Sequence, residues 1–113
     1  MLADDIQEIE ISIEDAKKAI RMGELVDRLE KNEDFKELIL EGYFKEDASR
    51  IVMLKADKTF QTPEKQSKID KDLLGISVFA DYLRTKKILA INLVDSLREH
   101  ELTHQELLQE TIQ

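Results

Sequence analysis

Cysteine and tryptophan are missing from this 113-residue chain, and the residues that interrupt regular structure are few, with three glycines and one proline. Without cysteine the chain can form neither a disulfide framework nor a thiolate metal site. Long uninterrupted elements are therefore expected, and the abundant leucine, glutamate, lysine and isoleucine favour helices. The sequence predicts an all-α protein.

Long apolar runs are also lacking, because no stretch approaches the roughly 18 apolar residues that span a membrane. The first residues have neither the basic nor the apolar region of a signal peptide, so we expect neither secretion nor a membrane partner. The net charge of −8 disfavours direct nucleic-acid binding, since phosphate backbones repel an acidic surface. An apolar content of 42% is too high for a disordered chain and predicts one helical domain, residues 1–113.

Apolar residues near the start of the chain recur every three or four positions, as in the buried stripe of a coiled coil. Strict continuation of this stripe falls on Gly23 and Asp27, where we expect it to fail and to resume in a shifted frame at Met22, Val26 and Leu29. The pattern predicts a helix over residues 4–31. Its stripe consists of Leu2, Ile6, Ile9, Ile13, Ala16 and Ile20.

The segment 33–56 predicts two short helices, with Asn32 as the first N-cap and Gly42 as a C-cap, or else one helix kinked at Gly42. Thr62 and Pro63 form a helix start signal, and nothing beyond them except Gly75 opposes a helix that continues to Ile112. This long helix carries a second apolar stripe. Its members are Ile69, Leu73, Ile76, Ala80, Leu83, Ala90, Val94 and Leu97.

The two stripes predict an antiparallel helical hairpin with a long C-terminal helix. Segments 1–31 and 84–112 have similar lengths and form a coiled-coil stalk, in which Ile6, Ile9, Ile13 and Ile20 pack against Ala90, Val94 and Leu97. Segment 33–83 forms a small helical head around Phe35, Tyr43, Phe44, Phe79 and Tyr82. Because the long helix leaves apolar positions unpaired, we also expect a homo-oligomer.

One short motif is typical of a catalytic zinc site. His100, Glu101 and His104 match His-Glu-x-x-His, in which two histidines one helical turn apart bind zinc and the glutamate polarises a bound water. A zinc metallohydrolase is therefore one alternative function.

The surroundings of the motif disfavour that alternative. Zinc hydrolases with this motif keep the residue two before the first histidine uncharged, where this chain has Arg98, and favour an apolar residue two after the second, where it has Glu106. Glu106 and Glu110 also lack the spacing of a third ligand. We interpret His100 and His104 as side chains of a solvated helix end. We expect no catalytic residue, no cofactor and no metal site, and therefore no enzyme.

Segments 29–48, 53–57, 74–77 and 82–85 together resemble a group of small helical proteins of tailed bacteriophages that are encoded near head and packaging genes. The resemblance spans residues 25–90 and rests on packing residues and glycines, so it implies a context and no site. It implies a non-enzymatic structural, assembly or accessory protein that binds phage head or tail components, in the host cytoplasm or the virion.

A different alternative is an acidic inhibitor that mimics DNA and binds a host enzyme. It would present ordered rows of carboxylates on a rigid helix, and the first helix offers such rows. They are formed by Asp4, Asp5, Glu8, Glu14 and Asp15.

Overall fold

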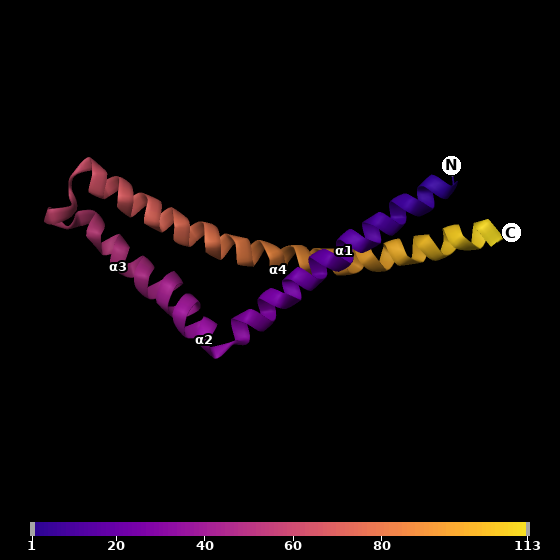
Figure 1. Ribbon diagram of the computed structural model, residues 1–113, viewed down its shortest axis with the longest axis horizontal. Helices are drawn as coiled ribbons and strands as arrows, with labels where there is room; N and C mark the ends of the chain where they lie inside the picture. Colours follow the sequence, from indigo (N-terminus) through magenta and orange to yellow (C-terminus); the bar gives the residue numbers. More distant parts are fainter. Residues whose placement is uncertain (1, 113) are drawn as a thin grey trace. The chain divides into compact units, whose positions relative to one another are not determined.

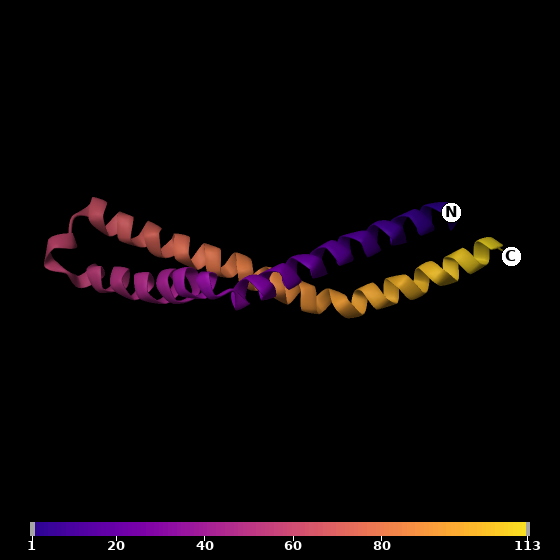
Figure 2. The ribbon, with the colours of Figure 1, turned by 60° about the horizontal axis from the view of Figure 1, so that its bottom comes forward.

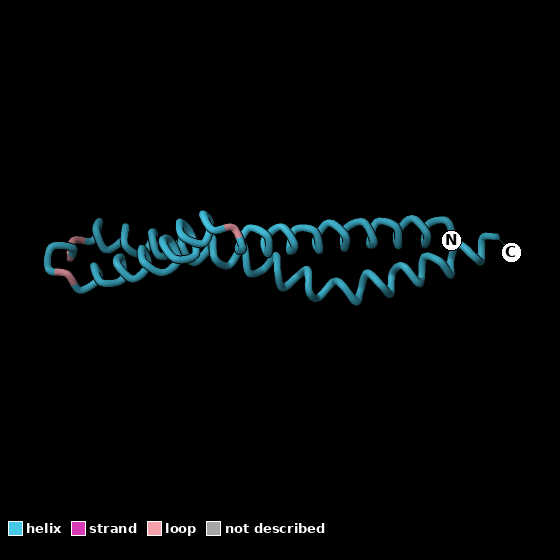
Figure 3. Tube along the Cα trace, turned by 90° about the horizontal axis from the view of Figure 1, so that it is seen from below, coloured by secondary structure: helices cyan, strands magenta, loops and turns pink. Residues whose placement is uncertain are grey.

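The computed structural model describes residues 2–112, of which 96% are helical, and it contains no strand within that range (Figure 3). The all-α prediction is confirmed. The elements in chain order are α1 (Leu2–Lys31), α2 (Glu33–Phe35), the π-helix η1 (Lys36–Asp47), α3 (Ala48–Met53), the 3-10 helices η2 (Leu54–Ala56) and η3 (Lys58–Phe60), and α4 (Pro63–Ile112), as Figure 1 shows.

The helix ends follow the predicted signals. Asn32 Oδ1 accepts a hydrogen bond from Phe35 N at 2.9 Å, which caps α2. Thr62 Oγ1 accepts one from Lys65 N at 3.3 Å, and Pro63 is the first residue of α4. Helix α4 then runs through Gly75 without a break, as expected.

The expected end at Gly42 is wrong. Helical structure runs continuously from Glu33 to Ala56, and Gly42 lies inside the π-helix η1 without the positive φ of a C-cap glycine. A Cβ atom built on Gly42 would lie 3.0 Å from Glu37 O, so the absence of a side chain suits the wider turn of this helix. The alternative of one irregular helix over 33–56 is the better description.

The chain divides into two compact units. Residues 2–26 and 85–112 form the first, called here the paired-helix unit, and residues 27–84 form the second, called the internal unit. In the paired-helix unit the start of α1 packs antiparallel against the end of α4 (Figures 1 and 2). The predicted antiparallel pairing is therefore confirmed.

The core of the internal unit lies between α3, η1 and the first part of α4. Ile51, Ile69 and Ile76 are buried, and fully burying each such side chain contributes about 1.5–3 kcal/mol. Partly buried residues surround them: Tyr43, Phe44, Ala48, Leu54, Phe60 and Leu73.

Three aromatic rings cover one end of this core. The Phe44 and Phe79 centroids are 5.5 Å apart with an edge-on geometry, and Tyr43 lies 5.9 Å from Phe44 and 6.4 Å from Phe79. The predicted aromatic cluster is thus present for these three residues. Tyr82, also expected in the head, lies on α4 with a side chain that is 51% exposed.

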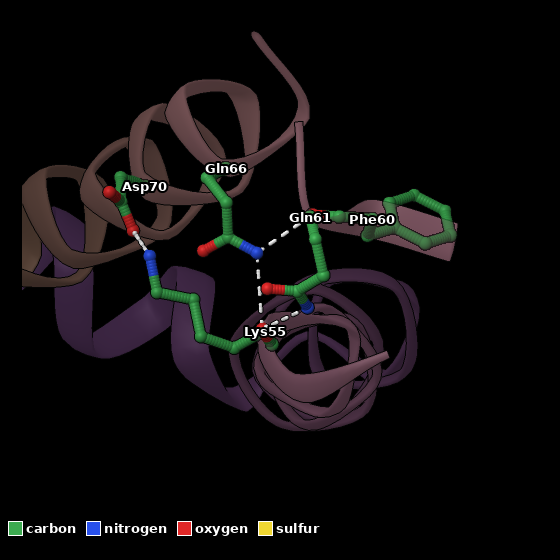
Figure 4. A network of polar contacts seen from close by, with 5 residues as sticks. All are labelled: Lys55, Phe60, Gln61, Gln66 and Asp70. Atoms are coloured by element: carbon green, nitrogen blue, oxygen red, sulfur yellow. Dashed lines mark hydrogen bonds and ion pairs between the residues drawn. The ribbon is translucent and has the colours of Figure 1, made fainter. Parts of the chain in front are cut away.

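Polar contacts hold the connection between α3 and α4 (Figure 4). Gln66 Nε2 donates to Phe60 O at 2.7 Å and to Lys55 O at 3.1 Å, and Gln61 Nε2 also donates to Lys55 O at 3.1 Å. The Lys55 ammonium pairs with Asp70 of α4 at 2.5 Å. These bonds satisfy carbonyl groups that the short 3-10 turns would otherwise leave without partners.

Asp57 stabilises the same connection. Its carboxylate accepts hydrogen bonds from Thr59 Oγ1 at 2.7 Å and from Thr59 N at 2.8 Å, and these two bonds lower the pKa of Asp57. Because the pKa is lowered in the folded protein, this contribution is present at neutral pH and is lost as the pH falls through the lowered pKa.

Candidate functional site

The residues of the His-Glu-x-x-His pattern lie at the contact between α1 and α4 of the paired-helix unit. Two observations fix the register of that contact. A Cβ atom built on Gly23 would overlap the Cβ of Ala90, and His104 Nε2 lies 3.0 Å from Glu10 Oε1. Residue i of α1 therefore faces residue 113 − i of α4, to within one position. Ile13 is level with His100, and Ile9 is level with His104.

The burial pattern agrees with this register along the whole contact. On α1 the buried and half-buried positions follow the expected stripe and continue it through Gly23 and Val26. On α4 half-buried residues recur every three or four positions, at Lys86, Ala90, Leu93, Leu97, His100, His104 and Leu107. Both sets have the spacing of a coiled-coil stripe.

The expected change of frame on α1 is right in part. Asp27 is exposed, whereas Met22 is half buried and Val26 is buried, as expected. Two positions were misjudged: Gly23 is buried where the helices approach closely, and Leu29 is exposed. Val94, expected to face α1, is also exposed, since the α4 stripe uses Leu93 instead. Ala90 and Leu97, the other two α4 positions expected to face α1, are half buried.

The structure also corrects the interpretation of the histidines as a solvated helix end. Both are half buried in the contact with α1, and the Nδ1 atom of His100 is buried without a hydrogen-bond partner among residues 2–112. His104 is held by Glu10 from the other helix. The stripe position of both residues, three and seven places beyond Leu97, could have revealed this from the sequence.

This geometry does not assemble a zinc centre from the described residues. No three His, Asp or Glu side chains within residues 2–112 are grouped so that they could hold a metal ion. Glu101, the residue that would polarise water, is exposed, as are Glu106 and Glu110. Instead, the side chain of His104 on α4 forms a hydrogen bond with Glu10 on α1.

The acidic rows of α1 are all exposed to solvent. They are Asp4, Asp5, Glu8, Glu14 and Asp15. Asp4 and Asp5 also lie in the first turn, where carboxylates interact favourably with the helix dipole. None of the described helices is long and apolar enough to cross a membrane.

Apolar side chains are exposed on α4 in the paired-helix unit. Ile88, Ile91 and Leu102 lie about half a turn away from the stripe that faces α1, and Ile91 is 72% exposed. With Asp95 and Arg98 between them, they have the three- and four-residue spacing of a further helix-packing stripe.

The internal unit has a comparable surface. Leu74 and Val78 lie on the side of α4 opposite the buried Ile76 and are 62% and 59% exposed. They line a shallow, mainly apolar depression with Gly75, Phe79 and Tyr82. The stripe of Ile69, Ile76 and Leu83 predicted the buried side of α4 but not this second set, which the four-residue spacing of Leu74, Val78 and Tyr82 indicates.

Comparisons with protein-family models, curated protein sequences and solved structures find no match to this chain.

Proposed function

We propose that this chain is a non-enzymatic protein with a structural, assembly or accessory role, which acts by binding other proteins through its helical surfaces. The resemblance to small helical proteins of tailed bacteriophages supports a phage context, with head or tail components as partners. The proposed place of action is the host cytoplasm or the virion.

One observation carries the proposal: α4 exposes apolar residues at helix-packing spacing on the side away from its partner helix. In the paired-helix unit these residues are Ile88, Ile91 and Leu102. An exposed row of this kind costs solubility and is typical of a surface that another helix covers. Burial of apolar area drives such binding, so the complex should survive moderate salt.

The test is affinity purification of the tagged full chain from lysates of infected and uninfected host cells. We expect capsid, portal or tail components to co-purify from the infected lysate and to stay bound at about 0.5 M salt, where screening shortens to a few ångström. Replacing Ile88 and Ile91 by serine should abolish the capture.

A matched variant separates this function from that of an acidic inhibitor. Asp4→Asn, Asp5→Asn and Glu8→Gln together remove a carboxylate row and leave the α4 row intact, so they should not affect capture of phage components. Binding of one host enzyme from uninfected lysate, released by salt and lost in this carboxylate variant, would contradict the proposal.

A further inference from the structure

A four-residue face of α4 in the internal unit has a symmetrical order. Lys71, Leu74, Val78 and Asp81 are separated by three, four and three positions, and all four are exposed. At about 100° per residue they occupy one strip of the helix surface, opposite the buried Ile69, Ile76 and Leu83. The strip therefore has a positive charge at one end, a negative charge at the other and an apolar centre.

This order complements itself when the strip is turned by 180°. In an antiparallel pair centred level with Ile76, Leu74 faces Val78 of the second copy, and Lys71 faces Asp81 of the second copy. The twofold symmetry repeats both contacts. A parallel pair would instead oppose lysine to lysine and aspartate to aspartate, which is unfavourable.

The local structure permits a close approach at this strip. Gly75, beside Leu74, carries no side chain, and the depression that it shares with Val78 and Phe79 can receive an apolar side chain from a second helix. Asp81 pairs with Arg84 of its own helix. Both partners of that ion pair are exposed, so Asp81 can accept Lys71 of a second copy at little cost.

We propose that the chain self-associates through this strip, as an antiparallel pair of α4 segments with Lys71 against Asp81 at each end. The inference deepens the proposed function by naming a second copy of the chain as the partner of one helical surface. Because the strip is short compared with a standard interface, the dimer is weak, with a dissociation constant on the order of 100 µM.

The test is sedimentation equilibrium of the full-length protein from about 10 µM to 1 mM. The wild type should change from monomer to dimer across this range. Lys71→Glu opposes carboxylates at both ends of the pair, and Asp81→Lys opposes ammonium groups, so each variant alone should dimerise at least about tenfold more weakly. An equimolar mixture of the two variants should dimerise again, because both ends of the mixed pair then join opposite charges.

Two controls isolate the strip. Arg84→Ala removes the ion pair within the helix and should leave dimerisation unchanged, and Lys18→Glu makes the same charge change on an exposed position of α1. Leu74→Ser should weaken the dimer without altering any charge, and circular dichroism of each variant verifies its helix content.

A wild type that remains monomeric at 1 mM would overturn the inference, as would single charge variants that dimerise like the wild type or a mixture that is not restored. None of these results would affect the proposed function, which the affinity purification tests with different residues. Conversely, a dimer that binds no phage component would uphold this strip and contradict the proposed function.

Discussion

At the scale of single residues, Gly23 allows a close approach of the two long helices. A Cβ atom built there would overlap the Cβ of Ala90 and would lie 3.1 Å from Lys86 O. Both Gly23 and Ala90 are small because the helix backbones come together at this level. Their positions also fix the register that brings Glu10 to His104.

The substitution Gly23→Ala tests this role against a matched control. Alanine normally stabilises a helix relative to glycine by about 1 kcal/mol, yet at Gly23 we expect the overlap to lower the free energy of unfolding by about 1–3 kcal/mol. At Gly75 an added Cβ meets only Tyr43 Oη at 3.7 Å, so Gly75→Ala should raise it by about 0.5–1 kcal/mol.

Urea unfolding followed by circular dichroism measures both changes. Adding Ala90→Gly to the Gly23→Ala variant should restore part of the loss, since it removes the overlapping methyl group. If both glycine variants were stabilised equally, the helices would not approach each other at Gly23.

The residues that the sequence identified correctly are those whose role is local. Asn32, Thr62 and Pro63 act within one helical turn, and their types alone predicted the helix ends. Gly23 was misjudged because periodicity treats glycine as a missing apolar residue, whereas its function depends on the partner helix. His100 and His104 were misjudged in the same way, since a motif match took no account of their stripe positions.

At the scale of elements, the contact between α1 and α4 is a stripe in which alternate spacings of three and four keep one face buried. Ile13 is 9% exposed in this stripe, whereas Ile11, two positions earlier, is 54% exposed. The same residue type on the same helix therefore occurs in two different environments.

Ile13→Asp should lower the free energy of unfolding by several kcal/mol, because it places a carboxylate in the contact level with His100 and leaves it without water. Ile11→Asp should change it by no more than about 0.5 kcal/mol. Thermal melts of the two variants under identical conditions measure the difference. Equal melting temperatures would contradict the stripe assignment.

The element that the sequence could not predict is the π-helix η1. Its apolar residues have ordinary helical spacing, although the helix that contains them is a π-helix over Lys36–Asp47. Periodicity reports which residues are buried, but it does not report the pitch of the turn that buries them. The antiparallel pairing of α1 with α4, in contrast, was predicted directly from the two apolar stripes.

At the scale of the whole molecule, the division into a paired-helix unit and an internal unit does not follow the order of the chain. The paired-helix unit combines the first and last segments, and residues 27–84 lie between them in sequence. Each unit contains its own buried residues: Ile13 and Ala16 in the first, and Ile51, Ile69 and Ile76 in the second. Separate apolar contacts allow local stability to differ between units even though α4 runs through both.

Hydrogen exchange of the full-length Ile76→Asp variant tests this independence. Ile76 is 6% exposed in the core of the internal unit, so a carboxylate there should destabilise residues 33–84 and speed the exchange of their amides, relative to the wild type. Amides of residues 5–22 and 90–108 should keep their protection, because the stripe between α1 and α4 is unchanged. Val78→Asp, on the exposed side of the same helix, is the control and should leave exchange in both units near the wild-type rate.

Equal loss of protection in both units would contradict this independence. It would mean that the chain unfolds as one cooperative unit and that α4 couples the stability of the two units.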